Sequence, residues 1–186
     1  EQYLDNQVYN FYVDNFGTDP ETWTSWKDIT PLPVQMFKMH EVKSFKGFSS
    51  RTWLSSGTTG KQSRHFLQGT TFYDLAIEIG RDRLPAELEG FNQVGLIPHS
   101  SEWKTSSLSY MFTRLFPDAS FAAQMNTANT YKISPTSVFK QYSRLSPMLL
   151  FGTSYAFVQF FDYLRDRGKT MKLPEGSVLL DTGGFK

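Results

Sequence analysis

The sequence predicts an α/β fold with a mostly parallel sheet and helices on both faces. From about residue 50 onward, short apolar runs alternate with amphipathic helical segments about four times. This order requires crossover connections, which join parallel strands and cover both faces of the sheet. Several of the expected strands end in glycine, serine or threonine. Ligands bind at the carboxyl ends of strands in such sheets, so we expect a site at these ends.

A helical and irregular arm over residues 1–50 is expected to precede the main body, residues 51–186. Prolines interrupt the second part of the arm, where we expect Trp23 and Trp26 to pack on the main body. Residues 33–38 are expected to form an extended approach or a single helical turn. Apolar residues at helical spacing predict a helix over residues 1–16 that ends at Gly17: Leu4, Val8, Phe11 and Tyr12.

The main body then follows in order. Thr71 with Asp74 resembles a capping box, and Ser134-Pro135 is typical of a helix start. We expect strands over residues 52–54, 65–67, 93–98, 120–125, 147–151 and 177–181. We expect helices over residues 71–83 and 108–115, after Ser134-Pro135, and over 154–167. The buried faces expected for the first and third helices are Phe72, Leu75, Ala76 and Ile79, and Val138, Phe139, Tyr142 and Leu145.

The most distinctive stretch connects the first two expected strands. It runs through Ser55, Ser56, Gly57, Thr58 and Thr59 to Gly60, Lys61 and Arg64. Glycines let the backbone approach a ligand closely, and hydroxyls with successive backbone N–H groups can donate hydrogen bonds to an anion. The stretch therefore predicts a phosphate-binding loop, with an ordinary Gly/Ser/Thr turn as the alternative. We expect it to share one edge of the sheet with His99-Ser100, Gly152-Thr153 and Thr182-Gly183-Gly184.

Other site classes find no support. The loop does not have the spacing of a Walker A motif or of a G-x-G-x-x-G dinucleotide motif, and no G-x-S-x-G elbow occurs. The 186 residues carry a net charge of +1 without a clustered basic stretch, so no nucleic-acid partner is expected. No apolar run has the length of a membrane span. With three scattered histidines and no cysteine, we expect no metal site and a cytoplasmic location.

The loop Ser55 to Lys61 resembles the signature loop of the adenylate-forming (ANL) superfamily, although Gln62-Ser63 stands where that loop has Pro-Lys. Four further segments resemble the LuxE-type acyl-protein synthetases within it: residues 33–38, 63–65, 106–111 and 182–186. Phenylacetate-CoA ligases are the nearest relatives of that branch. The likeness covers nearly the whole chain but only about the first half of a family member. The later Tyr-Gly-x-Thr-Glu motif and the acyl-accepting cysteine have no match here, so we expect an N-terminal portion.

The resemblance implies that the full-length protein is an ATP-dependent enzyme. It would activate a fatty carboxylate to an acyl-adenylate and pass the acyl group to a protein cysteine and then to an acyl-protein reductase partner. Magnesium would arrive with ATP, because the family's protein ligand for it is absent from this chain. The alternatives are a phenylacetate-type aryl- or acyl-CoA ligase, and a nucleotide-binding module without turnover.

The resemblance also implies roles for single residues. Ser55 to Gly60 and Lys61 would bind the β- and γ-phosphates, and Gly183, Gly184 and Phe185 would line the adenine pocket. The catalytic candidates are His99, Lys61 and Arg64, for which a structural histidine and exposed cations are the alternatives. The residues expected around the carboxylic acid are His99, Ser106, Ser107, Tyr110, Gly152, Thr153 and Tyr155.

Overall fold

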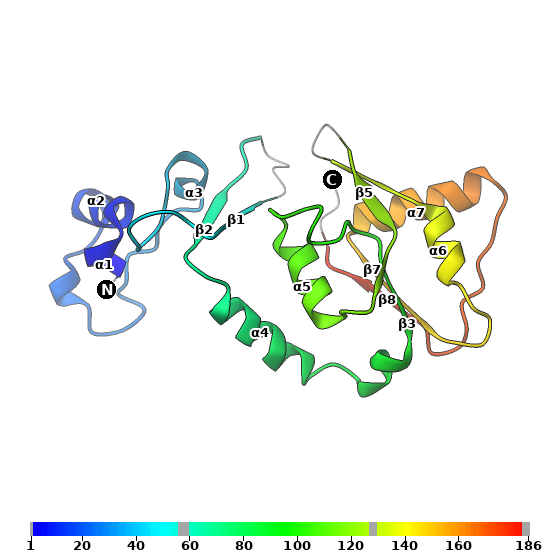
Figure 1. The fold of residues 1–186 in the computed structure, drawn as a ribbon. Helices are drawn as coiled ribbons and strands as arrows, with labels where there is room; N and C mark the ends of the chain where they lie inside the picture. The colour runs from blue at the N-terminus through cyan, green and yellow to red at the C-terminus, as the bar shows by residue number, and fades with distance from the viewer. Residues whose placement is uncertain (1, 56–59, 127–129, 184–186) are drawn as a thin grey trace. The chain divides into compact units, whose positions relative to one another are not determined.

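The computed structural model describes residues 2–55, 60–126 and 130–183 of the chain, and it divides into two compact units (Figure 1). The first unit is Glu1–Phe72 and the second is Tyr73–Lys186. The sequence placed a boundary near residue 50, before the first expected strand. The units instead divide inside a helix, so that this strand and its neighbour belong with the N-terminal segment.

The N-terminal unit begins with two helices where one was predicted. They are α1, Gln2–Asp5, and α2, Gln7–Phe16. Asn6 separates them: it is buried in extended conformation, and its side chain accepts a hydrogen bond from the Tyr9 amide. The helix ends before Gly17, as predicted, but its buried residues are Tyr9 and Val13. The predicted face is wrong in part, because Leu4 and Phe11 are exposed.

The rest of this unit contains short elements. The helical turns are η1, Pro20–Thr22, and α3, Met36–Met39, and the latter confirms one of the two forms expected for residues 33–38. Trp23 is partly buried and donates to the Thr18 hydroxyl at 2.8 Å. Trp26 is 77% exposed, so the prediction that it packs is wrong.

The first two predicted strands form an antiparallel hairpin. They are β1, Arg51–Leu54, and β2, Arg64–Leu67, in a register that pairs Trp53 with His65. Trp53 is buried, and the His65 ring stacks on Phe37 of α3 at 5.3 Å between centroids. The two strands form a sheet of their own. The expectation that β1 belongs to the parallel sheet is therefore wrong, since a short loop returns the chain directly to its antiparallel partner.

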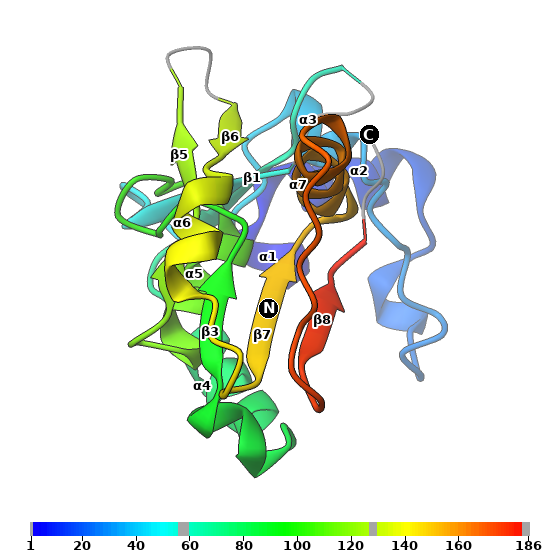
Figure 2. The same cartoon turned by 90° about the vertical axis from the view of Figure 1, so that its right-hand side faces the viewer.

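The second unit is built on a parallel four-stranded sheet, which confirms the α/β prediction. The strands are β3, Asn92–Gly95; β4, Ser120–Phe121; β7, Met148–Gly152; and β8, Val178–Asp181. Their order in the sheet is β4-β3-β7-β8, and every neighbouring pair is parallel. Figure 2 shows β3, β7 and β8 side by side with their carboxyl ends pointing the same way.

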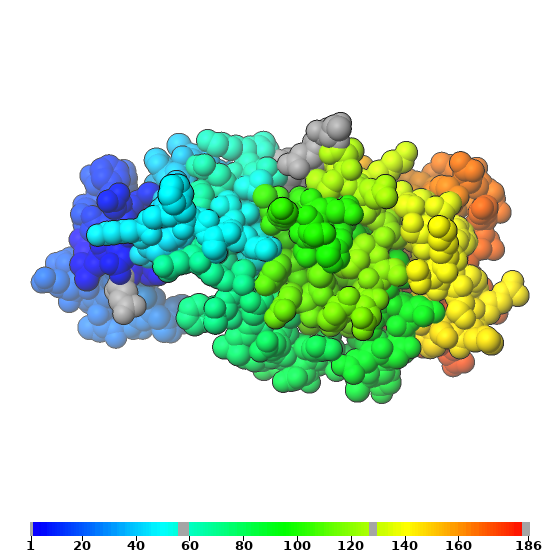
Figure 3. Space-filling view, in the orientation of Figure 1, coloured from blue at the N-terminus to red at the C-terminus, as the bar shows by residue number. Residues whose placement is uncertain are grey.

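Helices cover both faces of this sheet. On one face Met148 and Leu150 of β7 join a cluster with Val138 of α6, Pro135–Gln141, and Phe160 of α7, Ser154–Asp166. On the other face Leu149 and Phe151 join Phe112 of α5, Ser107–Leu115, and Leu88 of η2, Ala86–Gly90. In Figure 3 the green segment that contains α5 forms part of the surface of this unit. The alternation along β7 follows from the period of a strand.

The predicted strand over residues 120–125 is interrupted at Ala122. The Ala122 amide donates to Gly95 of β3, whereas its carbonyl accepts from Ser134. The chain therefore leaves the parallel sheet and forms an antiparallel hairpin of β5, Ala123–Met125, and β6, Tyr131–Ile133. The sequence did not predict β6.

Two further predicted buried faces are wrong, the first entirely and the second at Leu145. In α4, Thr71–Arg81, the buried residue is Ile77, whereas Phe72, Leu75, Ala76 and Ile79 are exposed. This helix carries two apolar stripes, and its sequence alone does not say which one packs. Leu145 is 93% exposed because α6 ends at Gln141, before the helical spacing reaches it.

Candidate functional site

The hairpin of the first unit carries the described part of the predicted phosphate loop. Ser55 follows β1, and its amide donates to the Ser63 carbonyl at 3.0 Å. Its hydroxyl oxygen accepts from the Ser63 amide at 2.9 Å, and its carbonyl accepts from the Gln62 side chain at 2.7 Å. Three hydrogen bonds thus close the base of the loop. Four of the predicted phosphate ligands, Ser56, Gly57, Thr58 and Thr59, lie outside the described residues.

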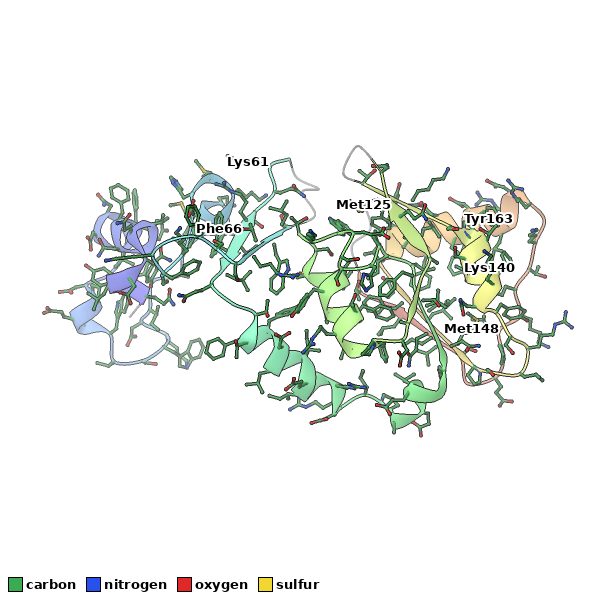
Figure 4. All side chains as sticks on the ribbon, viewed as in Figure 1. Lys61, Phe66, Met125, Lys140, Met148 and Tyr163 are labelled. Carbon is green, nitrogen blue, oxygen red and sulfur yellow. The ribbon has the colours of Figure 1, made fainter. Side chains whose placement is uncertain are left out.

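The far side of the loop carries a glycine and two cations. Gly60 has φ +102°, a conformation that glycine adopts at little cost. Lys61 is exposed and lies at the loop end of the hairpin (Figure 4). Arg64 begins β2, opposite Leu54, and its guanidinium carbon lies 5.5 Å from the centroid of the Phe66 ring. The Arg64 Nε atom is buried and has no hydrogen-bond partner among the described residues. Ser63 is buried and pairs with His65 Nε2 at 3.1 Å.

The second predicted group lies at the carboxyl edge of the parallel sheet. His99 follows β3, and the Ser101 amide donates to its Nδ1 at 3.2 Å. The Ser101 hydroxyl lies 2.7 Å from the same nitrogen. Because Nδ1 accepts, a neutral ring carries its proton on Nε2, which can then donate to a ligand. The ring stands edge-on to Phe121 at 4.7 Å, so its plane is fixed by packing.

The first residues after β7 form the next part of this edge. Thr153 caps α7, and its hydroxyl accepts from the Ala156 amide at 3.3 Å. The same hydroxyl lies 3.0 Å from the Tyr131 hydroxyl, and burial raises the pKa of Tyr131. The Trp103 ring lies 5.3 Å from that of Tyr131. This edge therefore carries two aromatic pairs, His99 with Phe121 and Trp103 with Tyr131, and Tyr131 contacts Thr153.

The turn after β8 completes the edge. Thr182 donates its amide to the Gly152 carbonyl at 3.0 Å, which holds this turn beside the end of β7. Gly183 has φ +77°, and its amide donates to Asp181 Oδ1 at 2.8 Å. Asp181 Oδ2 accepts from the Ser154 hydroxyl at 2.7 Å. The structure thus brings Gly183 close to Gly152 and Thr153, whereas Gly184 and Phe185 lie outside the described residues.

Several predicted substrate residues make hydrogen bonds within the fold. Ser106 is the N-cap of α5, where its buried hydroxyl accepts from the Ser109 amide at 3.1 Å. The Tyr110 hydroxyl donates to Asp74 of α4 at 2.7 Å, and the Ser107 carbonyl accepts from Tyr73 at 3.3 Å. Residues 106–110 thus pack α5 against α4.

Gly152 and Tyr155 complete the predicted set. A Cβ atom at Gly152 would lie 3.0 Å from the Leu96 Cβ, so this glycine permits close packing. Tyr155 is exposed on the first turn of α7.

Four residues of this edge were not predicted from the sequence: Tyr131, Trp103, Ser154 and Asp181. The sequence could have indicated Asp181, since an acidic residue directly before Thr-Gly-Gly at a strand end is placed to bind the turn that follows. No sequence pattern indicated Tyr131, because its strand was not predicted.

A pocket of about 370 Å³ lies at the opposite edge of the same sheet. It is lined by Asn92 and Ser120, which begin β3 and β4, and by Arg81, Glu89 and Asp118. Topology favours the carboxyl edge for ligands, and His99, Thr153 and Gly183 of the predicted set lie there. We therefore take the carboxyl edge as the candidate site.

No helix in the described part of the chain is long and apolar enough to cross a membrane. Among residues 2–55, 60–126 and 130–183, no three histidine, aspartate or glutamate side chains gather in a way that could hold a metal ion. No protein-family model matches the chain, and neither the curated proteins nor the solved structures contain a match.

Proposed function

We propose that this chain is the ATP-binding N-terminal portion of an adenylate-forming ligase of the LuxE type, which activates a fatty carboxylate. The observation that carries the proposal is the glycine- and hydroxyl-rich loop with Lys61 that joins two antiparallel strands. The acyl group would then pass to a protein cysteine and to an acyl-protein reductase partner.

The donor chemistry of this loop suits a polyphosphate. Lys61 and Arg64 supply positive charge, and Ser55 keeps a hydroxyl proton to donate, since its oxygen is already an acceptor. The transition state of adenylate formation gathers negative charge on the leaving pyrophosphate, and fixed cations and donors stabilise such charge. Magnesium bound to the phosphates would neutralise part of that charge.

The carboxylate substrate would bind at the carboxyl edge of the parallel sheet. Packing on Phe121 holds the His99 ring, and Nε2 is its free donor for a carboxylate oxygen. The Thr182 and Gly183 turn lies beside the end of β7. One edge thus offers both a donor for the acid and the turn that the resemblance assigns to the adenine.

The test is carboxylate-dependent exchange of labelled pyrophosphate into ATP, measured on the protein that the complete gene encodes. We expect exchange with fatty acids, and little or none from residues 1–186 alone. Lys61→Ala is expected to lower kcat/KM for ATP about ten-fold, the scale of a lost charge-assisted hydrogen bond. The exposed Lys46→Ala is the matched control. Absence of exchange with any acid would exclude both enzyme functions, and ATP binding without exchange would favour a nucleotide-binding module.

A phenylacetate-type aryl-CoA ligase is the second candidate. The two ring pairs at the carboxyl edge, His99 with Phe121 and Trp103 with Tyr131, favour it, because aromatic rings pack well on an aryl substrate. The acyl acceptor separates the two candidates. Thioester formation on CoA with phenylacetate would favour this function, whereas hydroxylamine-sensitive labelling of a protein cysteine by fatty acid would favour the first.

A further inference from the structure

We infer that Asp181 is a positioning residue, which fixes the expected nucleotide-binding turn, Thr182-Gly183, against the start of α7. This inference rests on the proposed function. Asp181 is the last residue of β8 and lies between two segments with different expected ligands. One is the Thr182-Gly183 turn, and the other is the start of α7.

Both carboxylate oxygens of Asp181 are used. Oδ1 accepts from the Gly183 amide at 2.8 Å, which holds the turn at its left-handed φ of +77°. Oδ2 accepts from the Ser154 hydroxyl at 2.7 Å, at the first residue of α7. A carboxylate whose two oxygens bind two different segments fixes their separation as well as their conformation.

Further contacts show that the two segments belong together. The Thr182 amide and hydroxyl both donate to the Gly152 carbonyl, at 3.0 and 3.3 Å. Thr153 is in turn held by the Tyr131 hydroxyl. Without Asp181 the Thr182 contacts would still keep the end of β8 in place, but Gly183 would be free to change its backbone conformation. The expected effect is therefore on ligand geometry rather than on the sheet.

The test compares three variants in the pyrophosphate-exchange assay with the protein from the complete gene. Asp181→Ala is expected to raise KM for ATP and lower kcat, with kcat/KM about ten-fold lower, the scale of two lost hydrogen bonds. Asp181→Asn keeps an oxygen for Gly183 and an amide for Ser154, so it should restore activity to within about two-fold. Asp162→Ala is the control, since Asp162 is a partly exposed aspartate of α7 paired with Arg165.

A second measurement follows the turn directly. The Gly183 amide should exchange with solvent more slowly in the wild-type protein and in Asp181→Asn than in Asp181→Ala. Equal kinetics of wild type and Asp181→Ala would overturn the inference while leaving the proposed function intact. So would an Asp181→Asn protein as impaired as Asp181→Ala. Absence of exchange activity in the wild-type protein would overturn the proposed function and the inference with it.

Discussion

At the scale of single residues, Ser109 of α5 has an unusual environment. Its side chain is fully buried, and its hydroxyl has no hydrogen-bond partner among the described residues. A buried polar group without a partner costs free energy, so Ser109→Ala should leave the free energy of unfolding unchanged or raise it by about 1 kcal/mol. Urea unfolding followed by circular dichroism measures this change.

Ser106 provides the contrasting case three residues earlier in the chain. Its hydroxyl caps α5, and Ser106→Ala should lower the free energy of unfolding by about 1 kcal/mol. Only Ser106→Ala is thus expected to lower the free energy of unfolding, although both substitutions remove a serine hydroxyl from the same helix start. A loss of stability at Ser109 as large as that at Ser106 would mean that its hydroxyl is hydrogen-bonded after all.

Tyr131 gives a prediction about pH. Burial raises its pKa above the ordinary value of 10.0, so the folded protein keeps the neutral phenol at a pH where the unfolded chain ionises. The stability from this group is fully present below the unfolded pKa and is lost as pH rises through the folded pKa. Burial raises the pKa of Tyr73 too. The free energy of unfolding should therefore fall above about pH 10.

Urea unfolding between about pH 8 and about pH 11 tests this dependence. Tyr131→Phe loses the contact with Thr153, so its stability should be lower at neutral pH. Its further loss at alkaline pH should be smaller than in the wild-type protein. Parallel curves for the two proteins would show that Tyr131 does not contribute to the alkaline loss.

At the scale of elements, the contact between β3 and α5 depends on a glycine. A Cβ atom at Gly95 would lie 2.9 Å from Cε1 of Phe112, whose ring is stacked on Phe151 at 4.3 Å. Because that ring is fully buried, Gly95→Ala should lower the free energy of unfolding by about 1–3 kcal/mol. Thermal unfolding followed by circular dichroism measures it.

Gly80 is the matched control for this substitution. It lies in α4 with open space around the position of a Cβ atom. Gly80→Ala should therefore raise the free energy of unfolding by about 0.5–1 kcal/mol, because alanine favours helix. If both variants lost stability to the same extent, close packing at β3 would not be the cause.

Elements formed by continuous apolar runs could be predicted from the sequence. Met148 to Phe151 is such a run, and β7 lies where it was expected. The break at Ala122 could not be predicted, since it depends on which backbone groups Gly95 and Ser134 present to that residue. The same holds for β1: its residues indicate a strand, but its partner decides that the strand is antiparallel.

The residues of the candidate site also differ in how far the sequence predicts them. His99 and Thr153 were predicted because they follow apolar strands, and such residues lie at the carboxyl edge by topology. Ser106 was predicted to contact the acid and caps α5 in the structure, and the sequence does not separate these roles, because a serine hydroxyl can cap a helix or bind a ligand with the same chemistry. Asp181 was missed because its role depends on Ser154, 27 residues away in the chain.

At the scale of the whole molecule, both hydrophobic clusters of the parallel sheet lie within Tyr73–Lys186. A chain that begins at Gly69, just before α4, should therefore fold without the N-terminal unit and unfold cooperatively in urea. Dispersed amide signals in an NMR spectrum would show this. A collapsed, poorly dispersed spectrum would mean that residues 1–68 contribute to the core of the second unit.

The same shortened chain separates folding from nucleotide binding. It keeps His99, Thr153 and Gly183 but lacks Ser55 to Lys61, the loop expected to bind the phosphates. If the loop binds the phosphates, the shortened chain should bind ATP more weakly than residues 1–186 do, whereas both chains should bind adenosine equally well. Equal binding of ATP by both chains would show that the loop does not contact the phosphates. The function would then have to be sought in the second unit alone.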